Sequence, residues 1–358
     1  MDWLPYEPVE GDGLLLRPPR AQDAADLAAA WADPLIQRYV PALPDPDGAG
    51  DWIAAARSAP DRRELVVVED GTLAGGCRLY HLSSLDRTGE VGYWIAAQAR
   101  GRRLAARATA VLTGWAFRNG LGRLEILARP DNPASQRVAL AAGYRREGRR
   151  RGVELGRDGR RHDLIAFARL ATDPPGPAPR VLPDLPGGRL TDGVVELRPL
   201  HPDDTADVLA LEAHPEVAAA TVGPDHRDVA RMCAEAAADW LAGRVARLTI
   251  RDAASGAFAG DIGLFHFEPP TGQAMTGYDL LPAWRGRGYA TRAVRLLAGW
   301  AFMQVGVARL IAGTTPDNVA SQRVLERAGF QREGYQRARL PGPAGTRIDD
   351  VLYALLPG

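Results

Sequence analysis

Two stretches of this chain, PDNPASQRVALAAGY at residues 130–144 and PDNVASQRVLERAGF at residues 316–330, repeat one pattern in the same order. Shared composition can repeat Ala or Arg, but it does not repeat Asp-Asn, Ala-Ser-Gln-Arg-Val and Ala-Gly-aromatic in succession. Self-similarity at a long, fixed spacing indicates a duplicated structural unit. The chain is therefore predicted to contain two copies of one fold.

The repeat extends over nearly the whole chain. LLLRPPRAQDAADL, from Leu14, matches VELRPLHPDDTADV, from Val195, and GYWIAAQARGRRLAARATAVLTGWAF, from Gly92, matches GYDLLPAWRGRGYATRAVRLLAGWAF, from Gly277. Between the copies, a segment dense in Pro and Gly favours a linker over a helix or an inner strand. We expect a first domain over residues 1–172, a linker over 173–192 and a second domain over 193–358. A length of 358 residues also favours two domains.

Composition limits the classes of partner. The chain has 44 basic and 44 acidic residues, and a net charge of zero argues against broad binding to nucleic acid or to a membrane surface. Acidic residues interrupt the basic segment from Arg145 to His162, which predicts a solvated hairpin. Cys77 and Cys233 lie far apart and lack metal-ligand spacing, so we expect no metal site, no disulfide framework and a cytoplasmic location. The opening MDWLPYEPVEGD does not resemble a signal peptide, and no run of about 18 apolar residues predicts a membrane span.

Each copy reads as a mixed α/β unit with helices on both faces of a sheet. An opening strand leads to a helix after Asp23 or Asp204, which are suitable caps. Two β-rich runs and a Gly-Tyr strand follow, then a long amphipathic helix, a short apolar strand, the helix of the repeated stretch and a last strand. Gly143 and Gly329 stand where the residue after a helix is expected.

A glycine-rich turn connects the Gly-Tyr strand to the long helix in WRGRGYATRAVRLLAGWAF, from Trp284. The first turn of a helix has unpaired N–H groups and a partial positive charge, and glycine allows its backbone to approach a ligand closely. This geometry suits a phosphate group. The turn matches neither GxxxxGK[ST] nor GxGxxG, so it is not one of those nucleotide-binding motifs.

The spacing Arg285-x-x-Gly288-x-Ala290, followed by Asn318-x-x-Ser321, resembles the GNAT acyltransferase superfamily, and in particular its branch related to ribosomal-protein N-terminal acetyltransferases. The resemblance implies, in each copy, a mixed and mostly antiparallel sheet with a central splay. It also implies acetyl-CoA as co-substrate, with its pyrophosphate on the turn and its pantetheine arm in the splay. Carried onto the second copy, cofactor binding falls on Leu280, Leu281, Arg285, Gly286, Arg287, Gly288, Tyr289, Ala290, Asn318 and Ser321. Helix capping alone would also account for Asn318 and Ser321.

The implied reaction is direct attack of an amine on the acetyl thioester, which needs a base for the amine and a proton donor for the leaving thiolate. Ser321 is the expected donor. In this branch a Glu often stands two residues before Gly-Tyr; the first copy has Glu90 there and the second has Met275. Strand periodicity places Asp279 on the face of Met275, which makes it an alternative base. His81 and His266 occupy equivalent places, where a packed or hydrogen-bonded histidine is the simpler interpretation.

The two copies differ at the turn. The first reads Arg100-Gly101-Arg102-Arg103, and Arg103 replaces the glycine, at a cost of about 1–2 kcal/mol if φ is positive. We therefore expect one tight acetyl-CoA site, in the second copy, acting on a small-molecule or N-terminal amine. An acetyl-CoA sensor or scaffold without turnover is the alternative, and the acceptor cannot be read from a fold. We expect the two copies to contact each other as the subunits of a dimer do, within a single chain that is itself monomeric.

Overall fold

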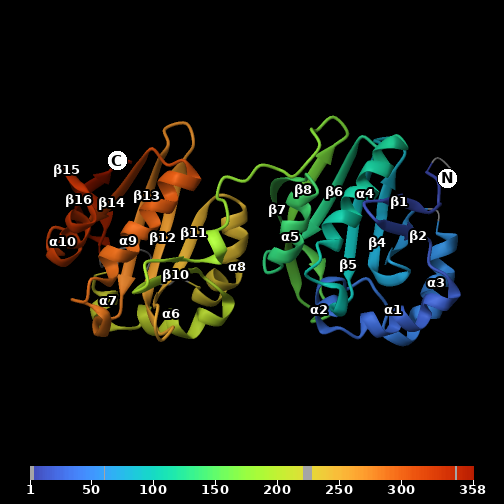
Figure 1. Ribbon diagram of the computed structural model, residues 1–358, viewed down its shortest axis with the longest axis horizontal. Coiled ribbons are helices and arrows are strands. Elements are labelled where there is room, and N and C mark those ends of the chain that lie inside the picture. Colours follow the sequence, from blue (N-terminus) through green and yellow to red (C-terminus); the bar gives the residue numbers. More distant parts are fainter. Residues whose placement is uncertain (1–3, 60, 221–227, 343–344) are drawn as a thin grey trace. The chain divides into compact units, whose positions relative to one another are not determined.

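The structure is a computed structural model that describes residues 4–59, 61–220, 228–342 and 345–358; residues 1–3 of the opening segment discussed above lie outside the described residues. The chain divides into two compact units, Met1–Pro179 (unit 1) and Arg180–Gly358 (unit 2). The division falls within the Pro- and Gly-rich segment 173–192. Within the described residues, each unit has one eight-stranded mixed sheet with helices on both faces, as expected (Figure 1).

The sheet of unit 1 has the order β1-β2-β3-β4-β5-β6-β8-β7. All neighbours are antiparallel except β5 and β6. Its strands are β1 (Val9–Gly11), β2 (Leu14–Arg17), β3 (Arg63–Glu69), β4 (Thr72–Ser83), β5 (Thr88–Ile95), β6 (Arg123–Ala128), β7 (Arg145–Leu155) and β8 (Arg161–Leu170).

Unit 2 repeats this arrangement, with the order β9-β10-β11-β12-β13-β14-β16-β15. Its strands are β9 (Leu190–Thr191), β10 (Val195–Pro199), β11 (Val245–Asp252), β12 (Phe258–Glu268), β13 (Gln273–Leu280), β14 (Arg309–Thr314), β15 (Gln331–Pro341) and β16 (Arg347–Leu355). The short strand β9 lies at the edge of the sheet, where a Pro- and Gly-rich segment can still pair. Leu182 and Leu185 are buried in the core of unit 2, so the chain belongs to that unit well before residue 193.

The helices cover both faces of each sheet. Unit 1 has α1 (Ala24–Trp31), α2 (Pro34–Tyr39), α3 (Ala49–Ser58), α4 (Leu104–Arg118) and α5 (Pro133–Ala141). Unit 2 has α6 (Thr205–Glu212), α7 (Pro215–Ala218), α8 (Val229–Leu241), α9 (Tyr289–Trp300) and α10 (Val319–Ala328). The apolar stripe of α9, with Ala293, Val294 and Leu297, packs on the sheet because these residues recur at helical spacing.

The residues predicted to cap α1 and α6 act one turn earlier than expected. Asp23 accepts a hydrogen bond from the backbone N–H of Arg20 (2.7 Å), and Asp204 accepts one from His201 (2.8 Å). Each carboxylate closes a short 3-10 turn before the helix and also binds a strand arginine: Arg17 contacts Asp23 at 2.7 Å, and Arg251 contacts Asp204 at 2.5 Å. The arginines draw these carboxylates towards the sheet, so neither bonds the first N–H groups of its helix.

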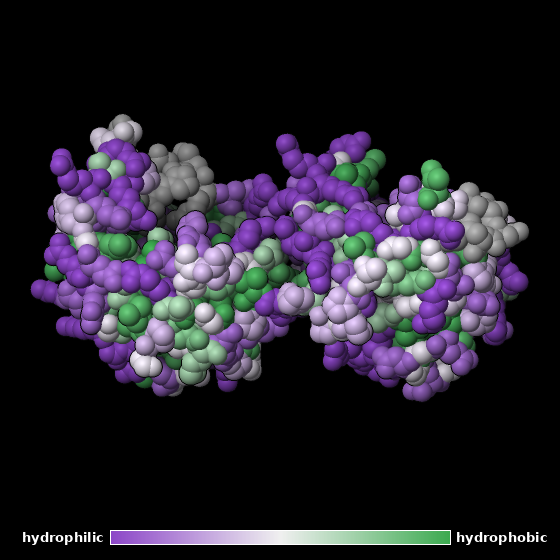
Figure 2. All heavy atoms as spheres, turned by 90° about the horizontal axis from the view of Figure 1, so that it is seen from above, coloured by the Kyte–Doolittle hydropathy of each residue, from purple (hydrophilic) through white to green (hydrophobic). Residues whose placement is uncertain are grey.

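The other local predictions agree with the structure. Gly143 and Gly329 adopt left-handed conformations, with φ of +87° and +104°; Gly329 directly follows α10, and Gly143 follows α5 after one intervening residue, Ala142. The basic segment from Arg145 forms the hairpin β7–β8, whose arginines are largely exposed and pair with acidic residues such as Glu125 and Asp163. Figure 2 shows a mostly polar surface, with apolar residues in small groups on the face in view.

Three further features concern possible partners. Cys77 and Cys233 are buried free thiols. In the part of the chain that the structure describes, three or more metal-ligating side chains do not gather into a group. None of the described helices combines the length and apolar character that crossing a membrane requires.

Candidate functional site

The sheet of each unit opens at its one parallel pair of strands. In unit 2, β13 and β14 pair at three positions, the last joining Met275 to Ile311. In unit 1, β5 and β6 likewise pair at three positions, the last joining Glu90 to Glu125. Beyond these residues the strands diverge, which confirms the predicted central splay. Glu90 and Met275 are therefore equivalent, and both stand where the opening begins.

The glycine-rich turn of unit 2 lies at the end of the splayed strand β13. Gly286 and Gly288 have φ of +74° and +80°, a region that residues with a Cβ rarely adopt, and Gly288 directly precedes α9. A Cβ atom built on Gly288 would meet no atom within 4 Å outside the neighbouring residues. The turn therefore leaves open space beside the unpaired N–H groups of α9.

The two arginines of this turn bind protein atoms. Arg285 donates from Nε to the carbonyl oxygen of Leu280 (3.2 Å), and its Nη1 contacts Glu216 at 2.8 Å. The guanidinium of Arg287 lies 5.5 Å from the ring centre of Trp284. Arg285 thus ties the turn to the strand that it follows, and the backbone of the turn remains as the predicted cradle.

The side chains of the remaining turn residues belong to the core. Leu280, Tyr289 and Ala290 are buried, and Leu281 packs against the α6–α8 side of the sheet. The hydroxyl of Tyr289 donates to Asp252 at 2.5 Å, which lowers the pKa of that carboxyl group to about 2. Any cofactor contact at Tyr289 or Ala290 must therefore come from the backbone N–H groups.

Asn318 and Ser321 meet beside the opening. Asn318 Oδ1 accepts the backbone N–H of Ser321 at 3.0 Å, so Asn318 caps α10. The Ser321 hydroxyl lies 2.9 Å from the hydroxyl of Tyr278 on β13. Burial raises the pKa of Tyr278 to about 12, because a phenolate would lose its hydration there. The phenol is therefore protonated at neutral pH.

Tyr278 is a site residue that the sequence analysis missed. The signal was present, because the Gly-Tyr pair recurs in both copies: in unit 1 the Tyr93 hydroxyl lies 3.0 Å from the Ser135 hydroxyl, and Asn132 caps α5. A tyrosine on a strand is usually a packing residue, and only the fold shows that it reaches the serine.

The candidate bases occupy different places in the two units. Glu90 is buried and accepts hydrogen bonds from the Tyr80 hydroxyl and from His81 Nδ1, the latter at 3.1 Å. Asp279 lies on β13, directly opposite Asp261 of β12 and on the strand face away from Tyr278. His266 is the counterpart of His81; both have a positive φ at a strand irregularity, and both are exposed.

A second carboxylate of unit 2, Asp350 on β16, was also missed. It is fully buried, pairs with Arg339 and lies against Gly313 of β14, where a built side chain would come within 2.5 Å of its Oδ1. The strand registers make Leu164 its counterpart in unit 1. Unit 2 therefore has an ion pair next to its splayed strand where unit 1 has a leucine.

The turn of unit 1 has nearly the same backbone as that of unit 2. Arg103 stands in the left-handed region, with φ +60° and ψ 16°, directly before α4. Arg100 donates from Nε to the carbonyl oxygen of Ile95 (3.2 Å) and pairs with Asp33 at 2.8 Å, as Arg285 does with Leu280 and Glu216. Arg103 therefore has the positive φ to which the cost stated above applies, and the turns differ chiefly in their side chains.

Comparison with known proteins agrees with this geometry. The family model described as an acetyltransferase (GNAT) domain matches residues 13–145 and 195–331. The chain is 41% identical over 84 residues to the probable N-acetyltransferase YjcK of Bacillus subtilis, covering 24% of this chain and 46% of YjcK. It is 29% identical over 107 residues to the ribosomal-protein-serine acetyltransferase of Escherichia coli, covering 30% and 59% of the two chains. These matches span about half of each relative.

Among solved structures, Mycobacterium smegmatis RimJ in complex with CoA-disulfide shares 26% identity and a TM-score of 0.41, covering 47% of this chain and 84% of RimJ. Because the family match occurs once in each half and together spans most of the sequence, the chain belongs to the GNAT acetyltransferase family and has two GNAT domains.

Proposed function

We propose that this protein is an N-acetyltransferase that transfers the acetyl group of acetyl-CoA to a primary amine, with the activity in unit 2. The observation that carries the proposal is the Gly288 turn before α9, because Arg103 stands at the equivalent position of unit 1 whereas both units have a Tyr–Ser hydroxyl pair beside the opening of the sheet. In unit 2 the turn follows the strand that carries Tyr278, so a phosphate cradle without a side chain and a proton donor occur together.

The residues of unit 2 fit acetyl-CoA. The space beside Gly288 and the first N–H groups of α9 suit a pyrophosphate. The N–H of Leu281 donates to Ala259 on β12, so strand alternation directs the N–H groups of Tyr278 and Leu280 towards the β14 side. Those two groups are the proposed donors to the pantetheine arm and to the developing oxyanion.

When bound, acetyl-CoA would supply an activated acetyl thioester. Ser321 would donate a proton to the departing sulfur and recover one from Tyr278, whose phenol is protonated at neutral pH and in turn takes up a proton from water. Asp279 is the proposed base. It lies on the strand face opposite Tyr278, so the amine proton leaves on one face and the thiolate proton arrives on the other. In unit 1, Glu90 is the corresponding candidate.

The acceptor is proposed to be a small-molecule amine or a protein N-terminus. A thiol-release assay with the full chain, acetyl-CoA and a panel of amines tests this, and a peptide with an N-terminal serine is one suitable member because of the E. coli relative. We expect CoA release with at least one amine, and a large loss of release in the Asp279→Asn variant. Tight acetyl-CoA binding without release on any amine would instead support the sensor or scaffold.

A further inference from the structure

Helix α2 of unit 1 and the segment that follows it lie across the opening between β5 and β6; we call residues 34–45 the strap. The strap starts beside the turn after β5, where Asp33, which caps α2, pairs with Arg100 at 2.8 Å. At the other end of α2, the hydroxyl of Tyr39 donates to the carbonyl oxygen of Asp131 at 2.9 Å, in the loop that follows β6. The helix therefore reaches from the end of one diverging strand to the end of the other.

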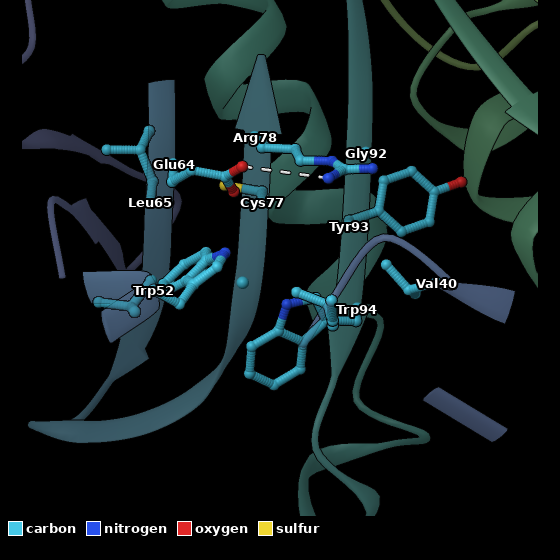
Figure 3. Close-up of a pocket in the computed structure, with 12 residues that line it drawn as sticks. Val40, Trp52, Glu64, Leu65, Cys77, Arg78, Gly92, Tyr93 and Trp94 are labelled. Atoms are coloured by element: carbon cyan, nitrogen blue, oxygen red, sulfur yellow. Dashed lines mark ion pairs between the residues drawn. The ribbon is translucent and has the colours of Figure 1, made fainter. Parts of the chain in front are cut away.

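The underside of the strap is apolar. Ile36 and Leu43 are buried in the apolar cluster between the sheet and the helices α1 and α3. Val40 and Leu43 line a narrow cavity together with Trp94, which lies on β5 beyond Glu90, the last residue that pairs with β6 (Figure 3). The centre of a water molecule has about 10 Å³ in this cavity, which is room for about one water. The strap thus leaves little space beside the diverged part of β5 on this face.

Polar contacts hold the outer side of the strap. Arg38 pairs with the carboxylate of Asp131 at 2.5 Å. Arg157, at the tip of the β7–β8 hairpin, donates to Asp45 at 2.7 Å and to the carbonyl oxygen of Leu43. These ion pairs are exposed in part or in large measure, and exposed ion pairs contribute little one by one. The strap can therefore open locally without unfolding of the sheet.

Tyr39 has a second contact beneath its ring. The guanidinium carbon of Arg129 lies 6.0 Å from the centre of that ring, and Arg129, with a side chain only 6% exposed, pairs with Glu154 of β7. An aromatic ring next to a cation that has lost its water is a favourable arrangement. Tyr39 is thus fixed both by its hydroxyl and by its ring.

The duplication supplies an internal comparison. In unit 2, α7 also begins with a proline, and Glu216 pairs with Arg285 of the turn as Asp33 does with Arg100. The other end differs, because the counterparts of the strap's contact residues are neither charged nor aromatic: Ala219 and Ala220 stand for Arg38 and Tyr39, and Thr315 and Leu340 for Arg129 and Glu154. Asp317 is retained at the place of Asp131. The contacts of Arg38 and Tyr39 are therefore a property of unit 1.

We propose that the strap closes the opening of unit 1 on the sheet face that carries Glu90, and that Arg38 and Tyr39 are the latch that keeps it closed. Strand alternation puts Glu90 and Trp94 on this same face. In the function proposed above, the amine arrives on the corresponding face of unit 2, so the strap bars an acceptor from unit 1. That role rests on the proposed function, whereas the closure itself does not.

The test is hydrogen–deuterium exchange of the full chain, followed by mass spectrometry of its peptides. The N–H groups of Val40 and Leu43 donate to backbone carbonyl oxygens within the strap, so their exchange reports its opening. The double variant Arg38→Ala/Tyr39→Ala copies unit 2 and is expected to speed exchange over residues 38–45 about tenfold or more, with no change in β3 and β4. The measurement needs neither acetyl-CoA nor an amine, so an inactive enzyme would not alter its outcome.

Two single variants complete the test. Tyr39→Phe removes only the hydroxyl and keeps the ring, so a smaller increase in exchange is expected. Arg118→Ala removes an exposed arginine of α4, outside the strap, and is expected to leave exchange over residues 38–45 unchanged. Unchanged exchange in the double variant, an equal increase across β3 and β4, or an equal effect of Arg118→Ala would each overturn the proposal.

Discussion

Replacing Gly288 by Arg copies the first turn into the second and tests where the phosphates of acetyl-CoA bind. Gly288 has φ of +80°, and Arg103 occupies the equivalent position at +60°. Because Arg103 adopts this conformation, the turn can form with an arginine. A Cβ atom built on Gly288 meets no protein atom within 4 Å, so the first atom of the new side chain has room.

The magnitudes for folding and for binding can be separated. A left-handed conformation costs a residue with a Cβ about 1–2 kcal/mol, which sets the expected loss in the free energy of unfolding. The affinity for acetyl-CoA is expected to fall at least tenfold, or about 1.4 kcal/mol, because the new side chain occupies the space beside the N–H groups of α9. The loss of stability is expected wherever acetyl-CoA binds. The loss of affinity is expected only if the phosphates of acetyl-CoA bind beside this turn.

Isothermal titration calorimetry measures the affinity, and chemical denaturation measures the stability. Gly288→Ala is the matched control, since it has the same backbone cost but only a methyl group, and a smaller loss of affinity is expected. The reverse change, Arg103→Gly, is expected to strengthen binding in unit 1 if the arginine side chain is what blocks it. A folded Gly288→Arg protein with unchanged affinity would refute a phosphate site at this turn.

Three further outcomes are expected. Titration of the natural chain with acetyl-CoA should give one tight site, and two equivalent tight sites would contradict the assignment to unit 2. Ser321→Ala should lower kcat by about 10²-fold, measured by steady-state kinetics, with little change in acetyl-CoA affinity, measured by calorimetry. An unchanged kcat would mean that Ser321 only packs or caps the helix. The folded pKa of Tyr278, about 12, lies above its ordinary value of 10, so burial of the neutral phenol stabilises the fold fully below pH 10 and this contribution is lost as the pH rises towards 12. The corresponding alkaline loss of stability should be smaller in Tyr278→Phe, measured by denaturation across that range.

Much of the architecture could be predicted from the sequence because its signals are local or repeated. The Asn318 cap, the glycine after α10 and the left-handed turn each depend on a few neighbouring residues, whose backbone preferences act wherever the segment lies. Duplication strengthened these signals, because each sequence pattern occurs once in each copy. The family resemblance supplied the splay between β13 and β14, which periodicity alone does not specify.

The tertiary structure decided which side chains meet. Tyr278 and Ser321 are 43 residues apart, and Asp350 meets Gly313 across neighbouring strands; both contacts depend on the register between distant segments. Arg285 was expected in the cofactor turn, and the direction of its side chain is set by a backbone carbonyl and by Glu216, 69 residues earlier. Sequence spacing carries no record of such pairings, because a side chain's partners are fixed only when the sheet has brought separate elements together.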